Sequence, residues 1–283
     1  MRSWLGIAFA LIYSATSGFA GPSANGPSRV VSMNLCTDQL AMMLAGPGQL
    51  ASVSYIARDR RASAMAEDAM AYPINHGRAE EIYLLKPDLV IAGTFSTRAT
   101  TDMLRRFGVP VAVFEPAYSL NDISDRIAQM GAVLGQDAAA TALIALFEAE
   151  IANISGVAGR PRAALYAANG YTSGQHSLAG QILEAAGFAN IAAELGYSHS
   201  GVLPLELLAM ADPDVVIATR PYERPSRSEE ILAHPVVSAL SRHPDTGEMR
   251  DADWVCGTPH VLNAIQKLRH LHSDTTSPEE GSE

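Results

Sequence analysis

Lysine is nearly absent from this sequence, in which only Lys86 and Lys267 occur among 283 residues. Acidic side chains outnumber basic ones by 30 to 20, and the resulting net charge of −10 excludes nonspecific nucleic-acid binding, which needs a basic surface. Because nearly all positive charge is on arginine, any bound anion must be held mainly by guanidinium groups, backbone N–H groups or helix ends.

The motifs of the common enzyme classes are also missing. The sequence contains no GxSxG, HExxH, P-loop or GxGxxG arrangement, and its histidines do not have the spacing of a metal-ligand set. We therefore expect a protein that is not an enzyme and needs no cofactor. An exported α/β enzyme remains the alternative from another functional class.

Beyond the N-terminus there is no apolar run long enough for a membrane span. Residues 1–20 carry Arg2, then an apolar run from Trp4 to Tyr13, and then small residues that end at Ala20. This pattern is typical of a secretory signal peptide. We predict cleavage near Ala20, a linker over 21–28 and a periplasmic location.

Cysteine is scarce as well, and its two copies are Cys36 and Cys256. In an oxidising compartment an even number of cysteines favours a disulfide, but the sequence does not tell whether two such distant positions meet. Two buried free thiols are the alternative. A shared thiolate metal site is a minor alternative, since no CxxC or Cys/His cluster supports it.

Short β-branched strands alternate with helical segments through most of the chain. Strands are expected at 29–33, 51–55, 89–92, 109–114, 163–167, 215–218 and 254–255. Helices are expected at 37–45, 100–107, 120–134, 137–154, 178–186, 229–240 and 259–271. This order predicts an α/β fold of two similar lobes with mostly parallel central sheets.

The domain boundaries follow from the same pattern. The predicted parts are an N-terminal lobe over 29–135, a connecting helix over 136–158, a C-terminal lobe over 159–272 and a flexible tail over 273–283.

An internal repeat supports the two lobes. Glu80 precedes Pro87-Asp88-Leu-Val-Ile-Ala by seven residues, and Glu206 precedes Pro213-Asp214-Val-Val-Ile-Ala by the same seven. In each copy a short helix ends before proline, Pro-Asp turns the chain and a buried strand begins. A Pro-Asp turn between a helix and a strand is common in α/β proteins. Such a turn does not readily explain why a glutamate precedes it at the same distance in both copies.

Three further features accompany this repeat: the segment Arg29-Val-Val-Ser, the segment 178–192 and the helical connector. Through these features the chain resembles the metal-chelate class of periplasmic substrate-binding proteins. These proteins serve ABC importers of vitamin B12, iron–siderophores and haem, and the resemblance covers about residues 29–272. It implies two lobes joined by one long helix, with the ligand in the cleft between them.

The resemblance also implies a membrane partner. Glu80 and Glu206 would be paired carboxylates, one on each lobe, that dock onto arginines of an inner-membrane ABC permease, which works with its ATPase. The alternative interpretation for each glutamate is a solvated carboxylate that the helix dipole favours.

Candidate ligand contacts follow from the expected sheets, because ligands of open α/β sheets lie beyond the carboxyl ends of the strands. Aromatic side chains there can form apolar walls against a large chelate, and arginines can pair with its carboxylates. The candidates selected in this way are Tyr55, Arg78, Phe95, Tyr118, Tyr171, Arg220, Tyr222 and Trp254.

No resident metal site is expected. His76 and His199 are weak candidates for binding haem iron or a bare metal, and a solvent-facing or hydrogen-bonded ring explains each more readily. The resemblance implies a periplasmic receptor, expected to be a monomer, for an iron–siderophore complex or a corrinoid. Haem or a bare transition metal is the alternative cargo on the same fold.

Overall fold

The computed structural model describes residues 26–154, 159–218, 226–240 and 250–276. The predicted signal peptide and the ligand candidates Arg220 and Tyr222 lie outside these ranges. None of the described helices is long and apolar enough to cross a bilayer.

The N-terminal lobe contains a five-stranded parallel sheet in the order β3-β2-β1-β4-β5. Its strands are β1 (Val30–Ser32), β2 (Leu50–Ser54), β3 (Ile74–Asn75), β4 (Leu89–Gly93) and β5 (Val111–Phe114). Its helices are α1 (Leu35–Leu44), α2 (Ala79–Leu84), α3 (Arg98–Arg106) and α4 (Leu120–Leu134), with short 3-10 turns at Tyr55–Arg58 and Asp68–Ala71.

Alternation along these strands places side chains on two separate cores. Val30 and Ile91 belong to the large core beneath α1 and α4, whereas their neighbours Val31 and Val90 belong to a small core beneath α2 and α3. The sheet is therefore covered on both faces, as parallel sheets are. This confirms the predicted class of fold.

The C-terminal lobe repeats this arrangement with a smaller sheet. Its strands pair in parallel in the order β10-β6-β8, and a separate antiparallel pair joins β7 to β9. These strands are β6 (Arg162–Tyr166), β7 (Tyr171–Ser173), β8 (Ala189–Asn190), β9 (Ser200–Val202) and β10 (Val215–Ala218). The antiparallel pair was not expected from the sequence.

The helices of this lobe again lie on opposite sides of the sheet. They are α6 (Leu178–Ala185), α7 (Ile191–Glu194), α8 (Leu205–Ala211), α9 (Pro235–Leu240), α10 (Asp251–Trp254) and α11 (Val261–Thr276), with a 3-10 segment at Arg227–Ala233. Residues of α6 and α11 join the large core, while Leu208 of α8 and Val237 of α9 belong to a third core.

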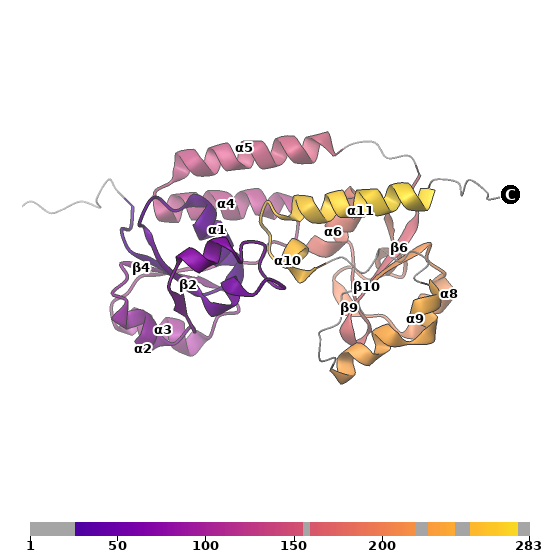
Figure 1. Ribbon diagram of the computed structural model, residues 1–283, viewed down its shortest axis with the longest axis horizontal. Helices are drawn as coiled ribbons and strands as arrows, with labels where there is room; N and C mark the ends of the chain where they lie inside the picture. Colours follow the sequence, from indigo (N-terminus) through magenta and orange to yellow (C-terminus); the bar gives the residue numbers. More distant parts are fainter. Residues whose placement is uncertain (1–25, 155–158, 219–225, 241–249, 277–283) are drawn as a thin grey trace, which may run out of the picture.

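The large core runs through both lobes without a break. It includes Ile127 of α4, Leu183 of α6 and Leu268 of α11 in one cluster of buried side chains. Above it, α5 (Asp137–Asn153) packs along α4 and extends toward the C-terminal lobe, as Figure 1 shows. This shared layer joins the lobes.

A segment of the C-terminal lobe also reaches across to the N-terminal lobe. The disulfide between Cys36 and Cys256 is formed, the Ala252 backbone N–H donates to the Arg61 carbonyl at 2.9 Å, and Gly257 approaches Ala117 so closely that a Cβ on it would lie 2.2 Å from the Ala117 Cβ. We call residues 250–258 the strap. Of the possibilities left open for the two cysteines, the structure has the disulfide.

The strap corrects one predicted element. Trp254-Val255 was expected to be a strand, but Trp254 ends the short helix α10 and Val255 follows it. Lys267 pairs with the buried Asp253 at 2.7 Å and secures this turn to α11. The last helix also continues to Thr276, so the first residues of the expected tail are helical.

Asp38, in the first turn of α1, has a fully buried side chain. Burial raises the pKa of Asp38 to about 6, although hydrogen bonds from Ser32 and Ser54 act in the opposite direction. Because the folded state then binds the proton more tightly than the unfolded chain, stability contributed below pH 4 is lost as the pH rises through 6.

We expect Asp38→Asn to remove this loss. Between pH 4 and pH 7 the free energy of unfolding of the wild type should fall relative to that of the variant by up to about 3 kcal/mol. Urea unfolding of both proteins at several pH values measures the difference, in which the other titrating groups cancel. Parallel curves for the two proteins would show that Asp38 does not titrate in this range.

Candidate functional site

The first of two neighbouring pockets lies beyond the carboxyl ends of β1, β4 and β5, where ligands of parallel sheets bind. Its volume is about 260 Å³. Phe95 and Phe114 contribute aromatic surface, and Asn34, Thr94 and Glu115 contribute polar groups. Phe95 is 82% exposed, so its ring is available to an incoming molecule.

The second pocket lies at the carboxyl end of β6 in the other lobe and has a volume of about 240 Å³. Tyr166, Tyr171 and Trp254 provide three aromatic side chains on its wall. Thr172 and Asp251 are polar members of the same lining. Both predicted aromatics of this lobe that the structure describes, Tyr171 and Trp254, are therefore beside one hollow.

The strap separates these pockets and belongs to both of them. Val255 lines the first and the second pocket, and it is half-exposed at the point where they meet. Cys36 and Gly257 line the first pocket as well. The disulfide thus fixes the ridge against which both pockets are built.

A third hollow opens between the lobes. Its volume is about 520 Å³, and it has Tyr118, Ser119 and Asp122 on the N-terminal side and His176, Gln181 and His199 on the C-terminal side. The rings of His176 and His199 lie 5.7 Å apart. The Gln181 side-chain oxygen accepts from the Leu120 backbone N–H at 3.0 Å and closes one side of the hollow.

Arg126 is a cationic member of the first pocket that strand-end reasoning missed. It projects from the middle of α4, and its Nε is buried without a hydrogen-bond partner in the described part of the chain. An unpaired guanidinium N–H beside an apolar pocket is suited to a carboxylate or other anionic oxygen of a ligand. Only the packing of α4 along the sheet brings it there.

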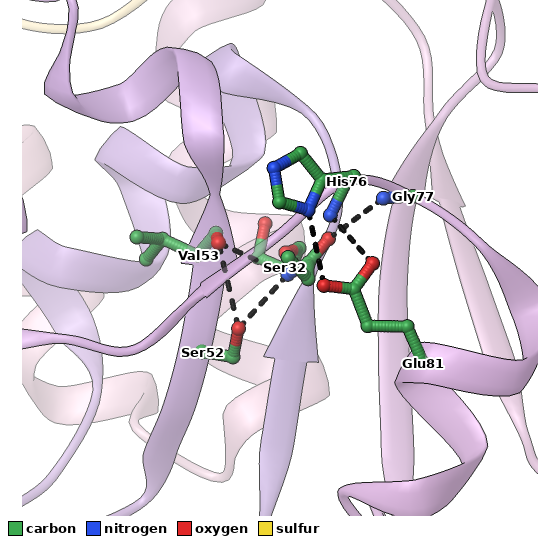
Figure 2. A network of polar contacts seen from close by, with 7 residues as sticks. Ser32, Ser52, Val53, His76, Gly77 and Glu81 are labelled. Carbon is green, nitrogen blue, oxygen red and sulfur yellow. Dashed lines mark hydrogen bonds and ion pairs between the residues drawn. The ribbon is translucent and has the colours of Figure 1, made fainter.

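Tyr55, His76 and Arg78 form a separate group at the β2–β3 edge of the N-terminal lobe. The Tyr55 and His76 rings stack with centroids 5.3 Å apart. Glu81 accepts from the His76 backbone N–H at 2.8 Å and contacts its Nδ1 at 3.1 Å, as Figure 2 shows. Although partial burial opposes it, these bonds hold the pKa of Glu81 below its usual range.

The base of this group is rigid because a buried asparagine joins three strands. The Asn75 side-chain amide donates to the carbonyls of Ser32 and Val53 and to the Ser52 hydroxyl, at 2.9 to 3.0 Å. His76 is thus held in a hydrogen-bonded position. Within the ranges that the structure describes, no cluster of three or more His, Cys, Asp or Glu side chains is arranged to hold a metal ion.

The two matched glutamates occupy equivalent places. Glu80 is in the first turn of α2 and Glu206 in the first turn of α8, and both side chains are exposed. Each helix covers the face of its sheet opposite to the large core. Figure 1 accordingly shows α2 and α8 on the side of the sheets that faces away from α4, α5 and α11.

A family model described as periplasmic binding protein matches residues 30–241. The cobalamin-binding proteins of two strains of Halobacterium salinarum are 28% identical over 215 residues, which make up 74% of this chain and 58% of theirs. The matched part thus spans less than two thirds of the length of these curated relatives.

Solved structures have the same fold at low identity. The periplasmic haem-binding protein RhuT from Roseiflexus sp. RS-1, in apo form, superimposes with a TM-score of 0.70 at 23% identity, over 89% of this chain and 100% of its own. The periplasmic vitamin B12 binding protein BtuF of Vibrio cholerae superimposes with a TM-score of 0.64 at 16% identity, over 89% of this chain and 99% of its own.

Proposed function

Because this chain belongs to the periplasmic binding protein family, we propose that it captures a metal chelate between its two lobes and delivers it to an inner-membrane ABC permease. The observation that carries this proposal is the pair of aromatic-lined pockets that meet at Val255. They lie at the carboxyl ends of strands in two parallel sheets, one in each lobe. No covalent chemistry is part of this function.

The lining favours a large ligand with an apolar face. Phe95 on one side and Tyr171 and Trp254 on the other offer rings to such a face, and burying it supplies most of the binding free energy. Arg126 would orient an acidic edge of the ligand. A ferric siderophore, a corrinoid and haem share this chemistry of a rigid metal complex with polar edges.

Haem is supported by one further observation. Tyr118, His176 and His199 line the same hollow between the lobes, and phenol and imidazole groups are the side chains that commonly bind haem iron. A ferric siderophore or a cobalamin has a more completely occupied metal, so these side chains would contact only its periphery. The two kinds of binding differ in their absorption spectra.

Titration of the purified protein with haem, cobalamin, several ferric siderophores and free Zn²⁺ tests the proposal. We expect saturable quenching of tyrosine and tryptophan fluorescence by one of the chelates, because aromatic residues line the pockets. Binding of haem through the third hollow should also shift the Soret band, and His199→Ala should alter that shift.

Two variants separate a specific cleft from nonspecific adsorption. Phe95→Ala and Tyr171→Ala should each weaken binding of the chelate roughly tenfold, since each removes one aromatic wall. Leu146→Ala serves as the control because this exposed residue lies on α5, outside the three hollows. Saturable binding of free zinc alone, or turnover of any of these compounds, would contradict the proposed function.

A further inference from the structure

Two exposed apolar side chains stand at the same position of the internal repeat. Leu84 is 78% exposed and Met210 is 80% exposed, and each comes four residues after the matched glutamate, Glu80 or Glu206. A single exposed leucine or methionine needs no explanation on a protein surface. Two at equivalent positions, each one helical turn from an equivalent carboxylate, call for a common cause.

The backbone repeats this geometry as well. The residue two positions after each apolar side chain, Lys86 or Asp212, has a positive φ, of 51° and 42° respectively. Neither residue is a glycine, so each copy accepts a left-handed conformation that most side chains avoid. The sharp end of both helices keeps the last turn of α2 and of α8 in the same orientation to the strand that follows.

A matched arginine secures each helix end to its sheet. Arg29, which precedes β1, donates from Nε to the Leu85 carbonyl at 2.5 Å. Arg162, the first residue of β6, donates from Nη1 to the equivalent Ala211 carbonyl at 2.7 Å. Leu85 and Ala211 are each the residue directly after the exposed apolar side chain.

The aspartate of each Pro-Asp pair completes this clamp. Asp88 accepts the Arg29 backbone N–H at 2.9 Å, and Asp214 accepts the Arg162 backbone N–H at 2.7 Å. Arginine and aspartate therefore bind the helix end and the strand start to each other in both lobes. Such a clamp holds a surface feature in place without belonging to any pocket described above.

We propose that Glu80 with Leu84 and Glu206 with Met210 form two equivalent docking patches for the permease, in which each carboxylate pairs with an arginine and each apolar side chain enters an adjoining apolar socket. This inference rests on the proposed function and extends it from two charges to two composite patches. Neither glutamate makes a hydrogen bond or ion pair with another described residue, so both carboxylates are available to a cationic partner.

The symmetry of the patches identifies the kind of partner. Two equivalent patches on one chain are matched by two copies of one surface, as a permease built from two identical subunits presents. Both helices cover the faces of their sheets that lie opposite the large core, so a partner that spans both lobes on this side can contact both. The buried centre of a protein–protein interface is more apolar than its rim, and methionine is enriched there.

Binding of the fluorescently labelled full-length protein to right-side-out inner-membrane vesicles tests the patches. The vesicles come from the source strain with this gene deleted, so that its own permease is present and unoccupied. We expect Leu84→Ser with Met210→Ser to weaken saturable binding at least roughly tenfold, and each single substitution to weaken it by a similar, smaller factor. Leu146→Ser, on the opposite layer and 67% exposed, is the matched control and should bind like the wild type.

The outcomes separate this inference from the proposed function. If Glu80→Ala with Glu206→Ala abolishes vesicle binding but the serine pair leaves it unchanged, the apolar part of the patches is wrong and the docking role survives. If neither pair changes binding, permease docking itself is wrong. An effect of only one serine substitution would contradict the equivalence of the patches, and self-association that the serine pair abolishes would assign them to a second copy of this chain.

Discussion

Replacing Glu80 and Glu206 together with alanine is expected to reduce uptake of the chelate to the background level of a strain that lacks the protein. Both carboxylates are exposed, and neither belongs to the three hollows of the cleft. An interface that loses two charge-assisted contacts loses several kcal/mol, enough to lower affinity by about a hundredfold or more. Uptake by the deletion strain that carries the variant measures this effect.

Ligand binding by the same variant is the decisive companion measurement. Because both glutamates lie on the far sides of the sheets from the large core, the affinity for ligand should be unchanged. Glu148→Ala with Glu150→Ala removes the same charge from two exposed residues of α5 and should leave uptake intact. Loss of ligand binding in the Glu80 and Glu206 variant, or normal uptake by it, would contradict the docking role.

The overall fold could be predicted because short stretches of sequence identify most of its strands and helices. Runs such as Leu89–Gly93 are buried on both faces and read as strands of a parallel sheet, and the Pro-Asp pairs mark where two of these strands begin. The prediction of where α1 starts was less accurate. Asn34 caps that helix by accepting the Cys36 and Thr37 backbone N–H groups, so it begins at Leu35, two residues before the expected start at Thr37.

The strand predicted at Trp254-Val255 is wrong because the conformation of these residues depends on tertiary contacts. Two apolar residues after Asp253 have no periodicity of their own, and the helical turn there depends on partners far away in the sequence. Lys267 holds the Asp253 carboxylate, and Arg61 of the other lobe accepts from the strap backbone. No local pattern contains this information.

The sequence predicted only those lining residues of the candidate site that lie next to the end of a strand. Phe95 and Tyr171 follow or begin strands, and the structure places them in the two pockets. Arg126 lies in the middle of an amphipathic helix, where its spacing resembles that of any solvated arginine. Tyr55 and Arg78 also follow the strand-end rule, yet they lie at the β3 edge of the sheet, with Tyr55 stacked on His76. The packing of the two lobes decides which strand ends lie beside the pockets.

The disulfide adds a covalent cross-link between the lobes to the connection that the main chain makes through α5. It joins the start of α1 in one lobe to the strap of the other and closes a loop with a sequence separation of 220 residues. Without it, the strap would keep the Ala252–Arg61 hydrogen bond and the contact of Gly257 with Ala117. Those contacts alone leave Val255, the ridge between the pockets, attached to the N-terminal lobe by weak interactions.

Cys36→Ser with Cys256→Ser is therefore expected to lower the free energy of unfolding by about 2–5 kcal/mol, because the open chain gains entropy when a long loop is released. For a protein of this size the melting temperature should fall by roughly 4–10 °C. Dithiothreitol should lower the melting temperature of the wild type toward that of the variant and leave the melting temperature of the variant unchanged. This comparison separates the effect of the disulfide from the effect of the substitutions.

Loss of the disulfide should also speed amide hydrogen exchange at Ala252 in the strap. The affinity for the chelate should weaken, since Val255 lines both pockets. A variant that melts with the wild type and binds ligand equally well would show that the lobes are held in register without the bond.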